Sequence, residues 1–230
     1  SCVIPMYNEE ANAANIIRDA ESLFLRLGHD WEIIVVESGS KDGTWQKIGE
    51  AIKGKERIEA YHQEKKEGMG SALRFAYSKC TKDLIFHLEA DSPFEMECFK
   101  KALPILTEND CVIGFRVGPR EKNFKWAYYN MKNMILIRTA YHVGYNLLLR
   151  LLFGLVVRDV NFAFKIFRSN RLKKLDLISD GWFIDAEILL ELKKDGILPI
   201  EMPIVYKDRT AGRSSVRLST PDHMIQEMIK

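Results

Sequence analysis

The sequence predicts an α/β protein with a mostly parallel central sheet that is flanked by helices. Short apolar runs alternate with helical stretches through the first half of the chain. Repeated strand–helix units of this kind form right-handed crossovers, which place successive strands parallel to one another. The run at residues 31–36 is almost entirely apolar, as is typical of a parallel strand that helices cover on both faces.

The elements of the first half follow from this alternation. Strands are expected at residues 2–5, 31–36, 57–62, 84–88 and 111–114. Helices are expected at residues 9–27, 42–52, 68–80 and 95–106. Gly39 and Gly43 mark the turn before the second helix, and the Gly68-Met69-Gly70 turn opens the third.

The second half is less regular. It is expected to contain an aromatic and basic helical segment, a strand, an amphipathic helix and a polar loop, at residues 125–153, 163–167, 183–194 and 207–215. Residues 198–205 are expected to form a strand at an edge of the sheet, because Pro199 and Pro203 lack the N–H that an inner strand needs. A further helix is expected after the loop.

No internal repeat, low-complexity tract or flexible linker divides the chain. We therefore expect residues 1–230 to form one domain with two lobes, residues 1–115 and residues 116–230. Apolar residues make up 47% of the sequence and charged residues 29%, which is typical of a folded globular protein.

The charge of the chain gives no general case for binding nucleic acid, because 34 Lys and Arg face 32 Asp and Glu and the net charge is +2. Residues 116–158 are nevertheless locally basic, with eight Lys or Arg and a single acidic residue, Glu121. The four cysteines, which show no metal-ligand spacing, are expected to be isolated thiols in a reducing compartment: Cys2, Cys80, Cys98 and Cys111.

No signal peptide is visible, and the chain is expected to begin inside a longer natural protein, since its first residues already have the character of a strand. The longest hydrophobic run, residues 147–157, is interrupted by Arg150 and is far shorter than the roughly 20 residues of a spanning helix. We expect no membrane span within these residues, and a membrane segment after Lys230 stays open.

The apolar run that ends in Glu89 and Asp91 is the first candidate site. If the run is a strand, two carboxylates spaced by two residues share one face at its carboxyl end. In open α/β sheets that end binds ligands, and carboxylates with no adjacent Lys or Arg suit a hard divalent cation that also holds phosphate oxygens. The alternative is an ordinary acidic junction between a strand and a surface loop.

Four loops follow successive strands of the first half, and all are expected to converge on one edge of the sheet. The Gly68-Met69-Gly70 turn at a helix N-terminus can present backbone N–H groups to phosphate. Glu37, at the end of the second strand, can accept a hydrogen bond from a base N–H or a ribose hydroxyl. The alternative for that loop is a simple approach to a helix, with Asp42 as N-cap.

Taken together, the loops resemble the family 2 glycosyltransferases. The matching segments are Val3-Ile4-Pro5-Met6-Tyr7-Asn8-Glu9-Glu10, Val35-Val36-Glu37-Ser38-Gly39-Ser40-Lys41-Asp42-Gly43-Thr44, and Glu89-Ala90-Asp91 at the place of the family's metal motif. The resemblance implies a GT-A fold, a nucleotide-sugar donor, and a Mg²⁺ or Mn²⁺ ion held by Asp91 and Glu89. It further implies that the donor site includes Pro5, Tyr7, Asn8, Glu9, Glu37, Gly68, Gly70, Glu89 and Asp91.

The second half resembles the dolichol-phosphate mannosyltransferase branch, whose members make polyprenyl-phosphate sugars. The segments that carry this resemblance are Gly114-Phe115-Arg116, Gly144-Tyr145-Asn146, Arg158-Asp159, Phe164-Lys165-Ile166-Phe167-Arg168, Phe183-Ile184-Asp185-Ala186-Glu187-Ile188, Glu201-Met202-Pro203-Ile204 and Arg209-Thr210-Ala211-Gly212-Arg213-Ser214. It implies an inverting transfer to a polyprenyl (dolichyl-type) phosphate at the cytoplasmic face of a membrane, with a GDP- or UDP-sugar as donor.

Chemistry suggests roles for individual residues. A metal at Asp91 would stabilise the departing diphosphate, while Arg209 closes over the phosphates and Ser214 donates a hydrogen bond. Arg116 and Arg138 suit an acceptor phosphate, which is already ionised and needs no strong base. A glycan hydroxyl acceptor, the alternative, would require a carboxylate base, for which the candidates are Asp159, Asp185 and Glu187.

These assignments have structural alternatives. Arg138 suits the solvated face of a helix equally well, and Asp185 and Glu187 suit the first turn of a helix, where the macrodipole favours acids. Residues 126–157 suit either the protein core or a peripheral membrane contact, because basic residues among aromatics are what an interfacial helix uses.

The sequence departs from the family pattern at several positions. Glu37-Ser38 replaces the usual Asp-Asp, Glu89 replaces the first Asp of the metal motif, Ser92-Pro93-Phe94 stands where a Gln is common, and Ala163 replaces a Gly. These changes indicate an unusual donor or weakened catalysis, so a nucleotide-sugar-binding module without turnover is a third hypothesis. A nicotinamide dehydrogenase is disfavoured because the third glycine of its fingerprint is missing.

Overall fold

A single seven-stranded sheet organises the chain. The computed structural model describes residues 1–91, 94–117, 135–205 and 226–228, with side chains left out for 135–140. The strands lie in the order β3-β2-β1-β4-β6-β5-β7. Their bounds are β1 Cys2–Met6, β2 Ile33–Ser38, β3 Ile58–Gln63, β4 Leu84–His87, β5 Cys111–Val117, β6 Lys165–Arg168 and β7 Ile200–Val205.

The first four strands are parallel, and the chain changes direction across the sheet between β1 and β4. From β1 it proceeds to β2 and β3 on one side, then returns to place β4 on the other side of β1. Loops that follow β1 and β4 therefore diverge at a topological switch point, where open α/β sheets bind ligands. The predicted fold class is confirmed for this half of the chain.

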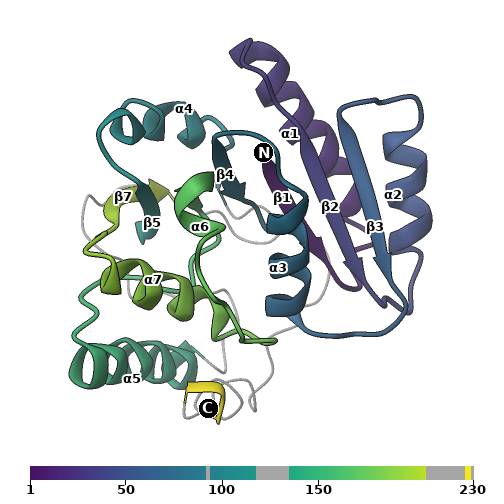
Figure 1. The fold of residues 1–230 in the computed structure, drawn as a ribbon. Coiled ribbons are helices and arrows are strands. Elements are labelled where there is room, and N and C mark those ends of the chain that lie inside the picture. Colours follow the sequence, from purple (N-terminus) through teal and green to yellow (C-terminus); the bar gives the residue numbers. More distant parts are fainter. Residues whose placement is uncertain (92–93, 118–134, 206–225, 229–230) are drawn as a thin grey trace.

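Helices cover both faces of the sheet. Their bounds are α1 Ala13–Leu27, α2 Thr44–Ile52, α3 Met69–Lys79, α4 Cys98–Ala102, α5 Ile135–Phe153, α6 Ser169–Leu172 and α7 Ile184–Lys194. One hydrophobic cluster joins the sheet to α1, α2 and α4, and a second joins its other face to α3, α5 and α7. Figure 1 shows α1 and α2 beside the β2–β3 end of the sheet and α5 and α7 beside each other near the β5–β7 end.

The half of the sheet beyond β4 mixes strand directions. Strand β6 runs antiparallel to both of its neighbours, β4 and β5, whereas β7 is parallel to β5. Strand β5 is longer than expected and extends to Val117, because Val205 of β7 continues to pair with it. Strand β7 lies at an edge, as Pro199 and Pro203 predicted.

The expected helix at residues 95–106 was wrong in its extent. It divides into α4 and a short 3₁₀ turn, Ile105–Thr107. Pro104 immediately precedes that turn, and a proline lacks the N–H and crowds the carbonyl that a continuing α-helix would use. Of the long helix expected at residues 125–153, the described part is α5.

The first turn of α3 packs directly against the backbone of residues 178–181. The amides of Gly70 and Ser71 both donate to the carbonyl oxygen of Asp180, at 2.8 and 3.3 Å. A Cβ at Gly70 would lie 2.1 Å from the Ser179 carbonyl oxygen, and one at Gly68 would lie 2.1 Å from that of Asp180. Gly68 also has a φ of +108°, so both glycines permit a backbone approach that any side chain would prevent.

None of the four cysteines forms a disulfide, as expected. Among the described residues, none of the helices has the length and apolar character needed to cross a bilayer.

The contact at Gly70 predicts a difference between two glycine-to-alanine variants. Gly70→Ala should lower the free energy of unfolding by about 1–3 kcal/mol, because its methyl group collides with the backbone of residue 179. Gly49→Ala, in the interior of α2 with open space around it, should be neutral or stabilising by up to about 1 kcal/mol. Urea unfolding of both proteins measures the difference, and equal stabilities would contradict the close approach.

Candidate functional site

The loops that follow β1 and β2 lock together through side-chain-to-backbone hydrogen bonds. The Asn8 side chain accepts from the Lys41 amide at 2.9 Å, while the Asn8 amide donates to the Ser40 hydroxyl at 2.9 Å. The Glu9 amide donates to the Thr44 hydroxyl at 2.8 Å. Asn8 has a φ of +53°, a left-handed conformation that asparagine tolerates better than most residues. Two of the predicted donor residues thus shape the loops that surround the switch point.

Tyr7 brings the loop after β3 to the same edge. The ammonium group of Lys66 lies 3.9 Å from the centre of the Tyr7 ring, a cation–π contact between loops that follow β1 and β3. Gly39 allows the β3 loop to approach, since a Cβ there would lie 2.6 Å from the backbone of residues 65–66. Pro5 lies within β1, one residue before its end. The expected convergence of these loops is therefore observed.

Glu37 is fully buried, and the chain itself engages both of its carboxylate oxygens. One oxygen accepts from the Ser40 amide at 2.5 Å, and the other lies 2.5 Å from Nδ1 of His62, which faces Glu37 across the β2–β3 pair. The Trp45 ring lies 5.2 Å from that imidazole. The contact with a base or ribose expected of Glu37 stays a prediction. A nucleotide would have to replace either the Ser40 amide or the His62 imidazole as a partner of the Glu37 carboxylate.

The His62 partner was missed by the sequence analysis. The two residues lie 25 positions apart, and only the register of β2 against β3 brings Glu37 opposite His62. A glutamate in place of the family's aspartate has one additional methylene, and its carboxylate meets the imidazole across this strand pair.

Glu89 and Asp91 lie in the turn that follows β4, not on the strand, because β4 ends at His87. The expectation that they share a strand face was wrong for this reason, although both remain at the carboxyl end of β4 beside β1. Both residues are partly buried. Burial, followed by the negative charge of Asp91, raises the pKa of Glu89 to about 8.

This pair of carboxylates fits a divalent cation that substrate oxygens help to hold. Among the described residues, no group of three or more His, Cys, Asp or Glu side chains forms a metal site. Mg²⁺ is commonly held by one or two carboxylates, several waters and substrate phosphates, so two protein ligands are sufficient. Asp91 raises the pKa of Glu89 by repulsion, and a bound cation would relieve that repulsion.

Two amides at the start of α3, those of Gly70 and Ser71, are engaged inside the protein. As described for the fold, the Gly70 and Ser71 amides donate to the carbonyl of Asp180. The phosphate contact expected of Gly68 and Gly70 stays a prediction, and the packing against residues 178–181 explains both glycines without a ligand.

Arg116 forms a two-point ion pair with Asp159. Nε and one terminal nitrogen of Arg116 donate to the two carboxylate oxygens of Asp159 at 2.6 and 2.8 Å, and both side chains are buried. Burial alone would raise the pKa of Asp159, but the charge and hydrogen bonds of Arg116 outweigh it and hold that pKa below its ordinary value. The guanidinium also lies 5.3 Å from the centre of the Phe162 ring.

A second buried ion pair lies next to the first. Nζ of Lys165, on β6, is 3.0 Å from a carboxylate oxygen of Asp185, on α7, and both side chains are almost fully buried. Nδ1 of His87 is 3.9 Å from the same oxygen. Burial raises the pKa of Asp185 while Lys165 opposes the rise, and burial lowers the pKa of His87 well below its ordinary value. Lys165 was not among the site residues predicted from the sequence.

Glu187 tethers the loop that precedes α7. Its two carboxylate oxygens accept from the amides of Ile178 and Ser179 at 2.8 and 3.0 Å. Glu227, in the described C-terminal turn, accepts from the amides of Gly181 and Phe183 at 2.6 and 3.3 Å. Acidic side chains from two separate segments therefore hold one loop.

Three predicted residues lie outside what the structure describes. Arg209 and Ser214 belong to residues 206–225, and the side chain of Arg138 belongs to residues 135–140 of α5. Their roles stay predictions.

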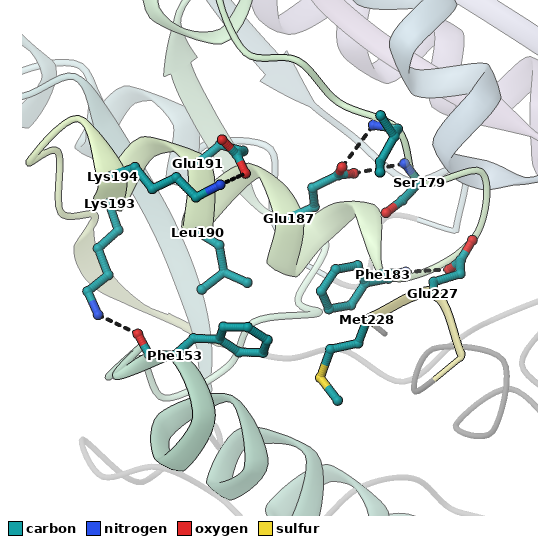
Figure 2. A pocket seen from close by; sticks show the side chains of 11 residues that line it. Phe153, Ser179, Phe183, Glu187, Leu190, Glu191, Lys193, Lys194, Glu227 and Met228 are labelled. Atoms are coloured by element: carbon teal, nitrogen blue, oxygen red, sulfur yellow. Dashed lines mark hydrogen bonds and ion pairs between the residues drawn. The ribbon is translucent and has the colours of Figure 1, made fainter. Parts of the chain in front are cut away.

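A cavity of about 450 Å³ lies between the end of α5, helix α7 and the C-terminal turn. Phe153, Phe183, Leu190 and Met228 contribute apolar walls, and Figure 2 shows them arranged around the same space. At its rim, Nζ of Lys193 donates to the carbonyl oxygens of Phe153 and Gly154 at 2.6 and 2.8 Å. The cavity thus has apolar walls, but its lining also includes polar and charged residues, namely Ser179, Glu187, Glu191, Lys193, Lys194 and Glu227.

Known proteins share both the sequence and the fold. The profile described as Glycosyl transferase family 2 matches residues 1–176. The polyprenol monophosphomannose synthase of Mycolicibacterium smegmatis is 26% identical over 227 residues, which cover 93% of this chain and 79% of that protein. The dolichol-phosphate mannosyltransferase of Pyrococcus furiosus is 26% identical over 226 residues, covering 96% of this chain and 60% of that protein.

Two solved structures illustrate the shared fold. Mannosyl-3-phosphoglycerate synthase from Rubrobacter xylanophilus superposes with a TM-score of 0.73 at 18% identity, over 99% of this chain and 70% of that one. Glucosyl-3-phosphoglycerate synthase from Mycobacterium tuberculosis, in complex with Mn²⁺, UDP and glucosyl-3-phosphoglycerate, superposes with a TM-score of 0.69 at 18% identity, over 99% of this chain and 77% of that one. The expected GT-A fold is confirmed. Because the family profile covers more than three quarters of the sequence, the chain belongs to glycosyl transferase family 2.

Proposed function

We propose that the protein transfers a sugar from a nucleotide-sugar donor to a polyprenyl phosphate in a metal-dependent, inverting reaction at the cytoplasmic face of a membrane. The observation that carries the donor half of this proposal is the convergence of the β1, β2 and β3 loops with Glu89 and Asp91 at the switch point of the sheet. The names of the relatives in Mycolicibacterium and Pyrococcus support a polyprenyl phosphate acceptor.

The buried carboxylates favour a phosphate acceptor over a glycan hydroxyl. A hydroxyl acceptor needs a base, and the three candidates already have partners inside the protein. Asp159 is bound by Arg116, Asp185 is paired with Lys165, and Glu187 accepts two backbone amides. A lipid phosphate is already ionised and needs none of them as a base.

In the proposed reaction, an oxygen of the acceptor phosphate attacks the anomeric carbon of the sugar while the bond to the donor diphosphate breaks. The departing diphosphate retains the electron pair of that bond. Mg²⁺ or Mn²⁺, held by Asp91 and Glu89, would supply positive charge beside the leaving group. Arg116, whose guanidinium carries five N–H donors and keeps two of its nitrogens on Asp159, would orient the acceptor phosphate.

An exposed apolar surface on α5 supports contact with a lipid bilayer. Leu147, Leu151 and Leu152 of α5 and Val156, three residues beyond its end, are termed here the α5 apolar surface. All four are exposed, and Arg150 lies among them. Apolar side chains interleaved with a basic residue suit the interface of an anionic membrane. The apolar cavity at the end of the same helix would accept part of an isoprenoid chain.

The proposal predicts acceptor-dependent cleavage of a donor. The protein should be incubated with Mn²⁺ and a panel of GDP- and UDP-sugars, with and without polyprenyl phosphate, and the release of nucleoside diphosphate measured. At least one donor should be cleaved much faster when the lipid phosphate is present. No lipid-dependent release from any donor would sink the proposal.

The same panel separates the alternatives. Release that depends on a glycan instead of a lipid phosphate would favour the hydroxyl acceptor, and Glu187→Gln should then abolish transfer while sparing donor binding. Metal-dependent nucleotide binding without turnover on any acceptor would favour a binding module, for which the internal commitment of Glu37 is the supporting observation.

Asp91 is the residue on which metal-dependent donor binding should depend most. Asp91→Ala removes one of two carboxylates from the expected metal site, so affinity for a nucleoside diphosphate in Mn²⁺ should fall by at least about tenfold. Thermal shift titrations with and without Mn²⁺ measure this loss. Asp19→Ala, an exposed aspartate on α1, is the matched control and should bind as the parent does. Unaltered nucleotide binding by Asp91→Ala would show that Asp91 is not part of the metal site.

The α5 apolar surface should be required for binding to vesicles. A Leu151→Glu/Leu152→Glu double variant places two charges in the proposed contact, and its binding to anionic vesicles should fall at least about tenfold. Leu25→Glu provides the control, because Leu25 is 64% exposed on α1 and Leu151 is 73% exposed. Flotation assays compare the three proteins. An equal loss of vesicle binding in Leu25→Glu, or no loss in the double variant, would contradict the role of the α5 apolar surface in membrane binding.

A further inference from the structure

A continuous series of buried contacts leads from helix α7 to the guanidinium of Arg116. We infer that Asp185 and Lys165 are positioning residues, which act through Phe162 to fix the orientation of Arg116. This inference rests on the proposed role of Arg116 in binding the acceptor phosphate, and it gives Asp185 a task other than that of a base.

The first step joins α7 to β6. The Asp185 carboxylate lies 3.0 Å from Nζ of Lys165, and their side chains are 1% and 0% exposed. A buried ammonium group without a partner is strongly disfavoured, so Lys165 must remain close to this carboxylate. Register pairs Lys165 with His87 on β4 and with Ile113 on β5, which fixes its backbone on both sides.

The second step joins Lys165 to Phe162. Nζ of Lys165 donates to the carbonyl oxygen of Phe162 at 2.6 Å. This bond spans the turn into β6 and holds the backbone of Phe162, whose side chain is buried in the core. A charged hydrogen bond of this kind is about twice as strong as a neutral one.

The third step joins Phe162 to Arg116. The centre of the Phe162 ring lies 5.3 Å from the guanidinium carbon, and Asp159, three residues earlier in the chain, binds the same guanidinium at two points. The segment 159–162 therefore contacts Arg116 with a ring at one end and a carboxylate at the other. Lys165 fixes this segment through its hydrogen bond to the Phe162 carbonyl, and Asp185 in turn holds the Lys165 ammonium group.

If the Lys165–Asp185 ion pair merely stabilised the fold, the effect of replacing Lys165 would depend on Arg116 no more than on any other buried residue. A positioning role predicts instead that the effects of changing Lys165 and Arg116 depend on each other, although Lys165 is paired with Asp185 and Arg116 with Asp159. Double-mutant cycles measure such dependence.

The test compares Lys165→Met, Arg116→Gln, the double variant and the parent protein. Lys165→Met should raise the KM for polyprenyl phosphate about tenfold, a change within the usual range of coupled sites. Its affinity for the donor nucleotide in Mn²⁺ should remain within about twofold of the parent value. In the Arg116→Gln background, Lys165→Met should cause little further change in the acceptor KM.

Lys173→Met is the matched control, because Nζ of Lys173 likewise donates to a backbone carbonyl, that of Cys80, away from Arg116. It should leave the acceptor KM unchanged. Phe162→Leu is the second variant if Lys165→Met does not fold, since it removes the ring at little cost in volume and retains the carbonyl that Lys165 binds. It should raise the acceptor KM in the same way and lose its effect in the Arg116→Gln background.

Equal fold-changes of KM in the parent and Arg116→Gln backgrounds would overturn the inference. So would parallel losses of donor and acceptor affinity, which indicate a general loss of structure. If the parent protein turns over no lipid phosphate, the proposed function fails by itself. The double-mutant cycle is then measured by urea unfolding of the same four proteins. Additive changes in the free energy of unfolding would overturn the positioning role, and non-additive changes would support it.

Discussion

Lys165 is fully buried in the middle of the sheet, and the requirement that this charge be paired constrains much of the surrounding structure. Its partner Asp185 comes from α7, so the helix is held at one place on the sheet. The adjacent pair, Arg116 and Asp159, imposes the same requirement on β5 and on the segment that leads into β6. Removing one member of such a pair typically costs about 3–5 kcal/mol, because the remaining charge is left without compensation.

The donor side is held together differently, by hydrogen bonds between loops and by close backbone contact. Asn8, Ser40 and Lys41 connect the loops after β1 and β2, and Gly39 admits the loop after β3. None of these contacts needs a buried charge. The carboxyl edge of the sheet therefore combines a donor side that is interlocked mainly by hydrogen bonds and close backbone contact with an acceptor side that is held by buried ion pairs, and the turn after β4 places Glu89 and Asp91 between them. The proposed reaction uses both sides at once.

The residues 178–183 connect the two sides. They accept and donate hydrogen bonds with α3, with Glu187 of α7 and with Glu227 near the C-terminus. Gly68 and Gly70 illustrate how such a contact changes an interpretation. From the sequence, a glycine turn at a helix N-terminus is typical of a phosphate site, whereas the structure places the backbone of Ser179 and Asp180 against it. The absence of a side chain at glycine permits either phosphate binding or close backbone packing, and the local sequence does not distinguish the two.

The sequence was sufficient to predict the alternation of strands and helices, the edge position of β7 and the family, because apolar patterning, proline chemistry and short motifs are local properties of the chain. It did not determine the antiparallel direction of β6 or the partners of Glu37, Arg116 and Asp185, whereas the break at Pro104 is a local effect of proline that the expected helix overlooked. The strand direction and these partners depend on strand register and on which elements pack together. A buried charge is satisfied by whichever opposite charge the folded chain brings near it, often from residues far away in sequence. The folded structure was therefore needed to show which of the candidate carboxylates already have partners inside the protein.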